Sequence, residues 1–158
     1  NWTGDAAGGS NPLDLLMDGP KSILANFAET LAAQGTPHWW LAWHELTNNG
    51  ASFNEAEAGD TDFDTFTASE EYIADTDPTD SNSYFRVTQI THESPVTVRF
   101  DSSTGRLYIL EGATNLVNGL WTNVPGAGPR LGAGDGDALT DTNEPPWGPY
   151  YRLGVELP

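Results

Sequence analysis

One acidic stretch near the middle of the chain carries the residue types and the spacing best suited to chemistry. It runs Asp60-Thr-Asp-Phe-Asp-Thr-Phe-Thr-Ala-Ser-Glu-Glu71, which puts Asp60, Asp62 and Asp64 at alternate positions and Glu71 at the far end. Ca²⁺ takes about six to eight oxygen ligands, and a loop of about 12 residues supplies them when short acids alternate and a bidentate Glu closes the site. Phe66, at the seventh position of such a loop, would add its backbone carbonyl. The sequence therefore predicts a calcium site formed by these five residues.

The sixth position of the loop departs from the usual pattern. Calcium loops of this kind place Gly there for a sharp turn, whereas this chain has Thr65. A residue with a Cβ atom adopts the required backbone conformation only at some cost in energy. We therefore expect weak to moderate calcium affinity. The alternative is a solvated acidic loop that holds no ion.

A helix is predicted directly after the acidic loop. Thr67 and Glu70 have the spacing of a capping box, in which each side chain satisfies a free amide at the start of the helix. The helix is expected to cover about residues 69–74, which carries Glu71 toward the ion and turns Tyr72 inward. The start signal thus places the last predicted ligand on a rigid element.

A second group of acids follows the helix. It consists of Asp75, Asp77 and Asp80, and the Asp77-Pro78 step is expected to end the helix. Two interpretations remain open: these acids hold a second metal ion, or they only cap a turn.

Net charge and composition exclude several classes of function. The 158 residues carry a formal charge of -17, from 23 acids against 6 bases. Ten of the acids lie between Glu55 and Asp80, where they would repel one another unless cations neutralised them. The chain has no basic stripe for nucleic acid or for an anionic membrane surface. It also lacks an apolar run of the roughly 20 residues that cross a bilayer, so we expect no membrane insertion.

The absence of cysteine bears on location. Neither disulfides nor thiolate metal sites are available to this chain. Bound calcium is another way to stabilise a secreted domain, and weak calcium sites are typical of extracellular modules. We therefore expect an extracellular or cell-surface location. The chain begins at Asn1 rather than Met, which favours a fragment or processed product whose targeting signal lies upstream.

Catalysis is not expected. The sequence has no Gly-x-Ser-x-Gly elbow, no His-Glu-x-x-His pair and no phosphate-cradling glycine loop. His38 and His44 are six residues apart, which puts them on different helical faces, so a zinc site is not favoured over surface histidines. Acids are abundant enough for glycan hydrolysis, but abundance does not place two of them across a cleft.

Carbohydrate binding is the main alternative function. Sugar rings stack on exposed aromatic side chains, and Trp121, Trp147, Tyr150 and Tyr108 are the candidates. Trp147 lies in a Pro-Pro-Trp-Gly-Pro segment, which makes it the candidate most expected to be exposed. The opposing interpretation is that these rings fill a core. Three further tryptophans, Trp39, Trp40 and Trp43, are expected to pack the helical part onto the β part.

The first part of the chain, residues 1–28, is predicted to be a partial β-repeat. Two strands, at about 13–17 and 22–27, flank the turn Asp18-Gly-Pro20. The motifs Trp2-Thr-Gly-Asp5, Asn-Pro, Met-Asp-Gly, Lys-Ser-Ile and Ala-Asn-Phe27 resemble the final part of the internalin-type B-repeats of bacterial surface proteins. Only the last strands of such a repeat are present, so their edges are unpaired. Self-association through these strands, and hence a self-assembling fibre subunit, is therefore a further alternative.

The second part, residues 29–83, is predicted to be a helical calcium-binding module. One helix should follow Thr36-Pro37 and run through His38-Trp-Trp-Leu-Ala-Trp-His-Glu-Leu46, and a second should start at the capping box Ser52-Phe-Asn-Glu55. The acidic loop resembles the EF-hand-like loops of thrombospondin type 3 repeats and dockerins. Together with the Gly-Thr-Pro-x-Trp-Trp-Leu and Thr-Asp-Pro-Thr-Asp motifs, it is similar to a module near the C-termini of large secreted bacterial proteins.

The third part, residues 84–158, is predicted to be an antiparallel β-sandwich. Val96, Val98 and Phe100 alternate with polar residues, as do the apolar residues between Tyr151 and Leu157. Further strands are expected near 105–111, 121–124 and 139–142, with the spacing of a sandwich. This run resembles the C-terminal β-sandwich that accompanies the calcium module in the same secreted proteins.

The predictions combine into one fold class and one function. The fold is mainly β, with an antiparallel β-sandwich preceded by a small helical calcium-binding insert and a short N-terminal hairpin. The resemblances imply a non-catalytic, calcium-stabilised structural or adhesion module of an extracellular bacterial protein, such as a stalk, spacer or terminal domain. Resemblance indicates architecture more directly than activity.

Overall fold

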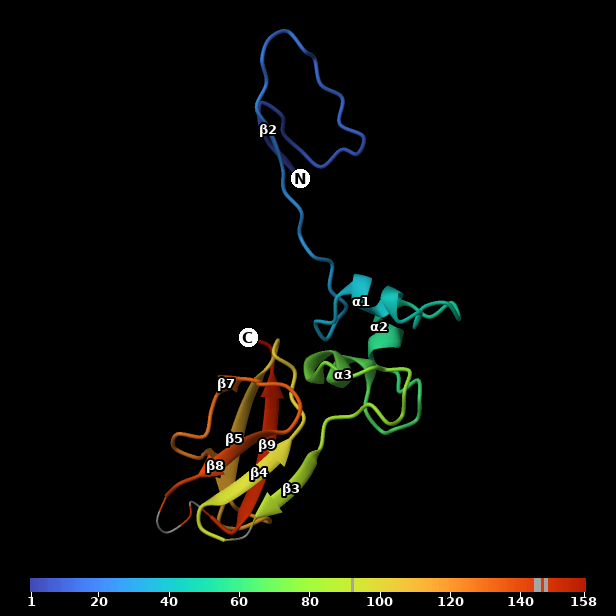
Figure 1. The fold of residues 1–158 in the computed structure, drawn as a ribbon. Coiled ribbons are helices and arrows are strands. Elements are labelled where there is room, and N and C mark those ends of the chain that lie inside the picture. The colour runs from blue at the N-terminus through green and yellow to red at the C-terminus, as the bar shows by residue number, and fades with distance from the viewer. Residues whose placement is uncertain (92, 144–145, 147) are drawn as a thin grey trace.

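The structure, a computed structural model, describes residues 1–91, 93–143, 146 and 148–158. The chain is mostly β, with antiparallel sheets and short helices (Figure 1). The helices are α1 (His38–Trp43), α2 (Phe53–Glu57) and α3 (Ala68–Ala74). The strands are β1 (Trp2–Gly4), β2 (Ile23–Ala25), β3 (Val87–Thr91), β4 (Val96–Phe100), β5 (Leu107–Ala113), β6 (Thr122–Asn123), β7 (Arg130–Leu131), β8 (Asp137–Asp141) and β9 (Tyr150–Glu156).

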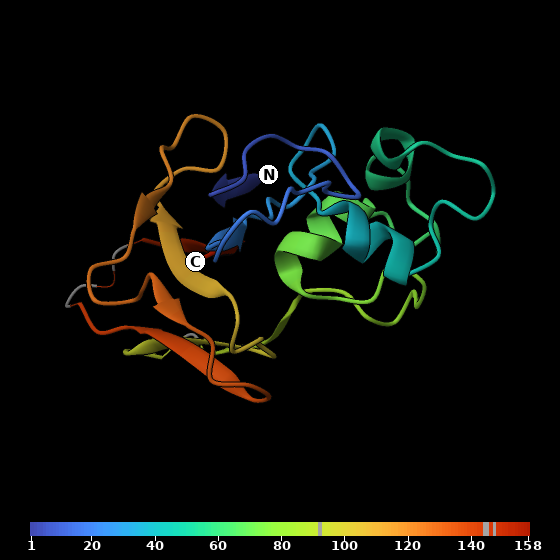
Figure 2. The ribbon, with the colours of Figure 1, turned by 90° about the horizontal axis from the view of Figure 1, so that it is seen from above.

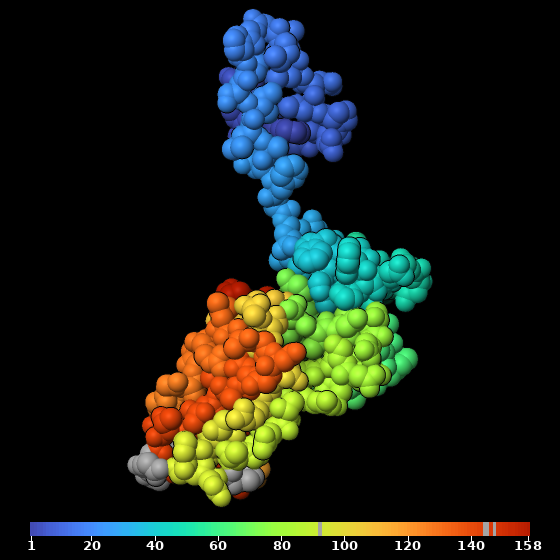
Figure 3. Space-filling view, viewed as in Figure 1, coloured from blue at the N-terminus to red at the C-terminus, as the bar shows by residue number. Residues whose placement is uncertain are grey.

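The N-terminal hairpin differs from the predicted pair of strands. β2 pairs antiparallel with β1, at the very start of the chain, and residues 13–17 form no strand. Asp5 favours the pairing of β1 with β2. Its carboxylate accepts from the Ser22 amide at 2.8 Å, and its own amide donates to the Ser22 carbonyl at 2.8 Å. The hairpin stands apart from the rest of the molecule on a narrow connecting segment (Figure 3). Its large apolar side chains are mostly exposed, namely Leu16, Met17, Ile23, Leu24 and Phe27.

The helical unit, residues 29–83, has a small core of its own. The buried residues are Ala32, Trp40, Leu41, Leu46, Ala56 and Ala68, with Phe53 and Tyr72 packed against them. The predicted capping box at Ser52 is confirmed, since Ser52 accepts from the Glu55 amide and Glu55 from the Ser52 amide. The predicted start of α1 is wrong by one position: Pro37 is the N-cap and makes no side-chain cap, while Thr36 is buried. α1 is also shorter than predicted, and the chain turns at Glu45 with φ of 59°.

The three tryptophans of α1 differ in burial. Trp40 is buried and packs against His44 and Tyr72, with ring centroids 4.5 Å and 5.3 Å away. Trp39 and Trp43 are 58% and 79% exposed, so the prediction that they pack against the sheets is wrong. The face of α1 that meets the core carries Trp40 and Leu41, and His38 stacks on Phe53 beside it.

The β-unit, residues 84–158, contains two antiparallel sheets. One has the order β3-β4-β8; in the other, β5 pairs along its whole length with β9 and at its two ends with β6 and β7. Side chains from both sheets form one core: Val98, Phe100, Tyr108, Leu110, Val124, Ala127 and Leu139, with Phe85, Tyr151, Leu153 and Val155 against it. The predicted alternation is therefore confirmed for β4 and β9, except that Leu157 lies beyond the strand and is 43% exposed.

The helical unit and the β-unit meet where α3 packs beside β9 (Figures 1 and 2). In the linker from α3 to β3, the ring of Phe85 packs against those of Phe100 and Tyr108, with centroids at 6.1 Å and 5.6 Å. None of the helices in the described part of the chain has the length and apolarity needed to cross a membrane.

Candidate metal centre

The acidic loop folds so that its alternating aspartates converge. Asp60, Asp62 and Asp64 each offer a carboxylate oxygen, and these oxygens all lie within 4.8 Å of one another. All three residues are half-buried. Like charges this close repel, so the loop must be held in its curled shape by other contacts.

The backbone of the loop provides those contacts. Asp60 accepts hydrogen bonds from the amides of Phe63 at 2.8 Å and Thr65 at 3.0 Å, through different carboxylate oxygens. Asp64 accepts from the amide of Phe66 at 2.8 Å. Side chains that bond to amides two to five residues ahead wrap the chain around the carboxylates. The loop is therefore curled inward rather than spread along the surface.

Two residues of the loop have left-handed backbone conformations. Phe63 has φ of 66° and Thr65 has φ of 87°. The conformational demand expected at Thr65 is confirmed, and the one at Phe63 adds to it. A non-glycine residue in this region costs of order 1–3 kcal/mol. The loop holds this geometry although neither residue favours it.

Glu71 reaches the loop from α3. The predicted capping box that starts this helix is confirmed, with Thr67 accepting from the Glu70 amide and Glu70 from the Thr67 amide. Glu71 is only 1% exposed. Its Oε1 accepts from the hydroxyl of Thr76 at 3.3 Å. The helix thus delivers a carboxylate to the interior beside the loop.

Three carboxylate oxygens at this place are buried and lack hydrogen-bond partners among the described residues. They are Glu71 Oε2, Asp62 Oδ2 and Asp64 Oδ2. Glu71 is not part of the trio whose oxygens lie within 4.8 Å of one another, but the charges of Asp62 and Asp64 act on it. A buried anionic oxygen without a partner is costly, and either a proton or a cation would lower that cost.

The electrostatics at this centre favour protons or a cation. Burial, and after it the negative charges of Asp62 and Asp64, raises the pKa of Glu71 to about 8. Burial is also the largest cause that raises the pKa of Asp62, with the charges of Asp64 and Asp60 adding to it. Both shifts have the sign expected when carboxylates crowd together with no positive charge among them.

The donor set suits a hard cation. All candidate ligands are oxygens, which Ca²⁺, Mg²⁺ and Mn²⁺ prefer, whereas softer metals favour nitrogen or sulfur. A flexible loop with one long carboxylate from a neighbouring helix suits calcium better than the strict octahedron that magnesium requires. Phe66 as a carbonyl ligand stays a prediction.

The second acidic group does not converge. Asp75 pairs with Arg106 at 3.3 Å and accepts from the Ser103 hydroxyl. Asp77 lies 3.5 Å from His44, and Asp80 accepts from the Asn82 amide at 3.0 Å. Within the described residues, the trio in the loop is the one group with metal-ligand geometry. The contacts therefore fit the turn-capping interpretation, and α3 ends at Asp75, in a left-handed conformation, before the Asp77-Pro78 step that was expected to end it.

The carbohydrate candidates lie in different surroundings. The guanidinium of Arg152 lies over the ring of Trp121, 4.8 Å from its centroid, and also bonds Glu111 at 2.6 Å. Tyr108 fills the core at 1% exposure, as the opposing interpretation held. Tyr150 is 40% exposed beside an open pocket of about 600 Å³. Trp147 lies outside the described residues.

Two residues important to this region were not singled out from the sequence. Glu57 is fully buried and accepts from the backbone amides of Gln34 at 2.8 Å and Thr36 at 3.4 Å, which ties α2 to the preceding loop. The sequence feature that could have indicated this buried position is the alternating Glu-Ala-Glu-Ala run that contains Glu57. Arg106, in the β-unit, donates hydrogen bonds to carbonyls at the end of α3. No local sequence pattern predicts a contact of such long range.

Comparison with models of known protein families, with curated proteins and with solved structures finds no match to this chain. Its function must therefore be argued from the site itself.

Proposed function

We propose that this chain is a non-catalytic, calcium-stabilised structural or adhesion module of an extracellular bacterial protein. The observation that carries the proposal is the buried carboxylate of Glu71. Its Oε2, like one oxygen of Asp62 and one of Asp64, has no hydrogen-bond partner within the part of the chain that the structure describes. A calcium ion among these oxygens would remove both the desolvation cost and the repulsion.

Calcium would act by stabilising the folded state. An ion that binds the folded loop and not the unfolded chain stabilises the fold by about 1.4 kcal/mol when its free concentration is ten times the dissociation constant. The strained conformations of Phe63 and Thr65 favour a weak to moderate affinity. Such a site fills at extracellular calcium concentrations, which supports a location outside the cell.

The remaining parts of the proposal concern architecture. We interpret the two sheets with their shared core as a β-sandwich and the acidic loop as a thrombospondin type 3-like repeat. A chain with -17 net charge and no cysteine is suited to a calcium-rich, oxidising exterior. In this role the module would serve as a stalk, a spacer or a terminal domain.

Thermal unfolding with and without calcium tests the proposal. In millimolar calcium the midpoint should rise relative to the same protein in excess chelator, and magnesium at the same concentration should produce a smaller rise. The loop from Asp60 to Glu71 should lose amide-exchange protection first when calcium is removed. Superimposable transitions in calcium and in chelator would refute the proposal.

Self-association is a second candidate function, favoured by the N-terminal hairpin. Ile23 and Leu24 are 39% and 61% exposed, and β1 and β2 pair only with each other among the described strands. Exposed apolar edges invite pairing with another chain. Electron microscopy separates the two cases: fibres that disappear in a Leu24→Lys variant would support assembly, whereas single particles at every concentration would support a monomeric spacer.

A further inference from the structure

α3 belongs to two sites at once. Glu71, in the middle of the helix, is buried at the metal centre. The carbonyls of Tyr72 and Ile73, which follow it, accept from Arg106 Nη2 at 2.6 Å and Nε at 2.8 Å. Arg106 comes from the turn before β5 in the β-unit. One short helix therefore connects the candidate cation to the neighbouring unit.

Arg106 acts as a cap donated from outside the helix. The last carbonyls of a helix lack internal partners, and a cation near them also complements the helix dipole. The same guanidinium pairs with Asp75 at 3.3 Å and lies over the Tyr72 ring, 5.4 Å from its centroid. Ser103 adds a hydrogen bond to Asp75 from the same turn of the β-unit. These contacts form only while α3 keeps its position.

The loop makes its own contact with the linker into the β-unit. The ring of Phe66 stacks on that of Tyr84, with centroids 6.3 Å apart and planes 18° apart. Phe66 also lines an apolar pocket of about 220 Å³ together with Phe85 and Val155. The loop position expected to offer a carbonyl to calcium thus directs its side chain to the joint between the units.

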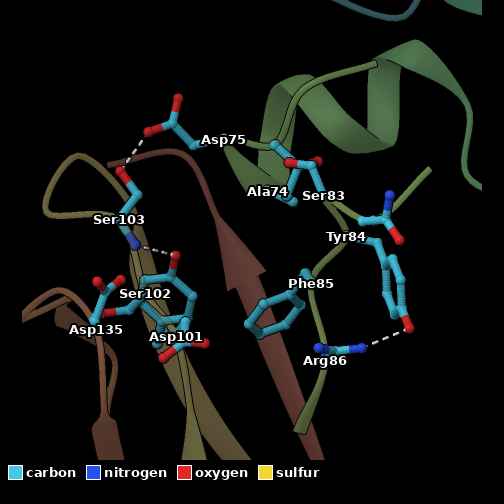
Figure 4. A pocket seen from close by; sticks show the side chains of 13 residues that line it. Ala74, Asp75, Ser83, Tyr84, Phe85, Arg86, Asp101, Ser102, Ser103 and Asp135 are labelled. Atoms are coloured by element: carbon cyan, nitrogen blue, oxygen red, sulfur yellow. Dashed lines mark hydrogen bonds between the residues drawn. The ribbon is translucent and has the colours of Figure 1, made fainter. Parts of the chain in front are cut away.

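Elsewhere the joint is loosely packed. A polar pocket of about 320 Å³ opens between the units, lined by Asp75 from the end of α3, Tyr84 and Phe85 from the linker, and Ser103 and Asp135 from the β-unit (Figure 4). Figure 4 shows Asp75 bonded to Ser103 across this opening. Because this opening separates the two units there, the joint depends on the contacts of α3, Phe66 and Phe85.

We infer that the cation at the acidic loop sets the rigidity of the joint between the helical unit and the β-unit. This inference rests on the proposed function, because it assigns a regulatory role to the same site. With the ion present, Glu71 and Phe66 are both fixed, and α3 offers its end to Arg106. Without the ion, repulsion among the carboxylates loosens the loop and α3, and the Arg106 contacts and the Phe66–Tyr84 stack weaken together.

The inference requires coupling in both directions. If calcium strengthens the Arg106 contacts, then the Arg106 contacts strengthen calcium binding by the same factor. Arg106→Ala should therefore weaken calcium binding although Arg106 is not a ligand, by about fivefold or more. Arg99→Ala is the matched control, because Arg99 is exposed on β4 of the same unit.

Paired spin labels measure the joint directly. The chain has no cysteine, so labels attach only at introduced positions such as Asn48→Cys in the helical unit and Val117→Cys in the β-unit, both exposed. Pulsed electron resonance should give one narrow distance distribution in calcium and a broad one in chelator. In the Arg106→Ala background the distribution should be broad in both, and in Arg99→Ala it should match the wild type.

The outcomes separate the inference from the function on which it rests. Calcium that binds with measurable heat but leaves the wild-type distance distribution unchanged overturns the inference alone. Calcium affinity of Arg106→Ala within twofold of the wild type also overturns it. No measurable binding of calcium to the wild type overturns the proposed function and the inference together. The wild-type comparison stands even where Arg106→Ala folds poorly.

Discussion

Thr76 holds Glu71 by two hydrogen bonds, one to its side chain and one to its backbone. The Thr76 hydroxyl donates to Glu71 Oε1 at 3.3 Å, and the Thr76 amide donates to the Glu71 carbonyl at 3.1 Å. This arrangement occupies one carboxylate oxygen and leaves the other buried, without a hydrogen-bond partner among the described residues. Thr76, which follows the C-terminal end of α3, therefore orients the predicted closing ligand of the loop.

Replacing Glu71 by Gln should separate metal binding from folding. Gln keeps the size of the side chain and removes a charge that lies buried among other acids. We expect calcium affinity to fall by about tenfold or more, while the metal-free protein becomes as stable as the wild type or more so. Calcium titration calorimetry and thermal unfolding in chelator measure the two effects.

Glu70→Gln is the matched control for this variant. Glu70 lies on the same helix but is exposed, and Gln serves equally in a capping box. Its calcium affinity should stay within about twofold of the wild type. Equal losses in the two variants would mean that general negative charge, rather than ligation by Glu71, attracts the ion.

The stability of the metal-free protein should depend on pH through Glu71. Its pKa is about 8 in the folded chain, against 4.5 for an ordinary Glu, so the folded state holds this proton more tightly than the unfolded state. The free energy of unfolding should therefore fall as pH rises from about 4.5 to about 8, and level off above that window. Asp62, whose pKa is also raised, contributes with the same sign.

Calcium should remove this dependence. Bound calcium keeps the Glu71 carboxylate ionised, so calcium affinity should rise with pH across the same window as protons are displaced. Chemical denaturation at several pH values, with chelator and with saturating calcium, gives both curves. A metal-free protein that gains stability between pH 5 and 8 would contradict the burial of Glu71.

Thr65→Gly should strengthen the loop. Thr65 has φ of 87°, where glycine carries no Cβ penalty. Relief of this strain, partly offset by the greater entropy of an unfolded glycine, should raise stability by about 1 kcal/mol and calcium affinity a few-fold. Thr61→Gly, at an exposed loop position whose φ is not positive, should instead lower stability. Opposite signs for the two variants in denaturant titrations are the expected result.

Asp137→Asn should weaken the β-unit independently of calcium. Asp137 is 6% exposed and accepts from Arg130, from the Ser102 hydroxyl at 2.7 Å and from the Ala133 amide at 2.9 Å. These donors hold its pKa below the usual range against the opposing effect of burial. We expect a loss of about 1.5–3 kcal/mol at neutral pH.

The pH dependence identifies this contribution. Because the folded pKa of Asp137 is depressed, its stabilisation is present above about pH 3.8 and is lost as pH falls below that value. The Asn variant should therefore lack part of the acid-induced loss seen in the wild type. Asp101→Asn, at an exposed acid that accepts one bond from the Gly136 amide, should change little.

Local patterns predicted the elements around the candidate site well. The capping boxes at Ser52 and Thr67 and the alternation in β4 and β9 depend on neighbours in sequence, and the structure confirms them. The alternate spacing of the three aspartates indicated their convergence, which hydrogen bonds from loop amides maintain.

Long-range contacts decided the features that were mispredicted. β2 pairs with β1 because Asp5 bonds Ser22 across the N-terminal hairpin, which no local pattern reveals. Trp39 and Trp43 are large apolar residues and were expected to be buried, yet the residues of α1 that are buried in the core are Trp40 and Leu41. For Asp75 the sequence left a metal ion and a turn cap open, and its ion pair with Arg106 from the β-unit is likewise a long-range contact.

Direct titration of the chelator-treated protein with calcium tests the central claim most directly. The account predicts saturable binding that is abolished in Asp62→Asn/Asp64→Asn, because these residues contribute two of the buried oxygens without partners. It predicts that the main binding event survives in Asp77→Asn/Asp80→Asn, because these two carboxylates lie outside the converging trio and make other contacts. No saturable binding by the wild type, or binding that persists unchanged without the Asp62 and Asp64 carboxylates, would contradict it.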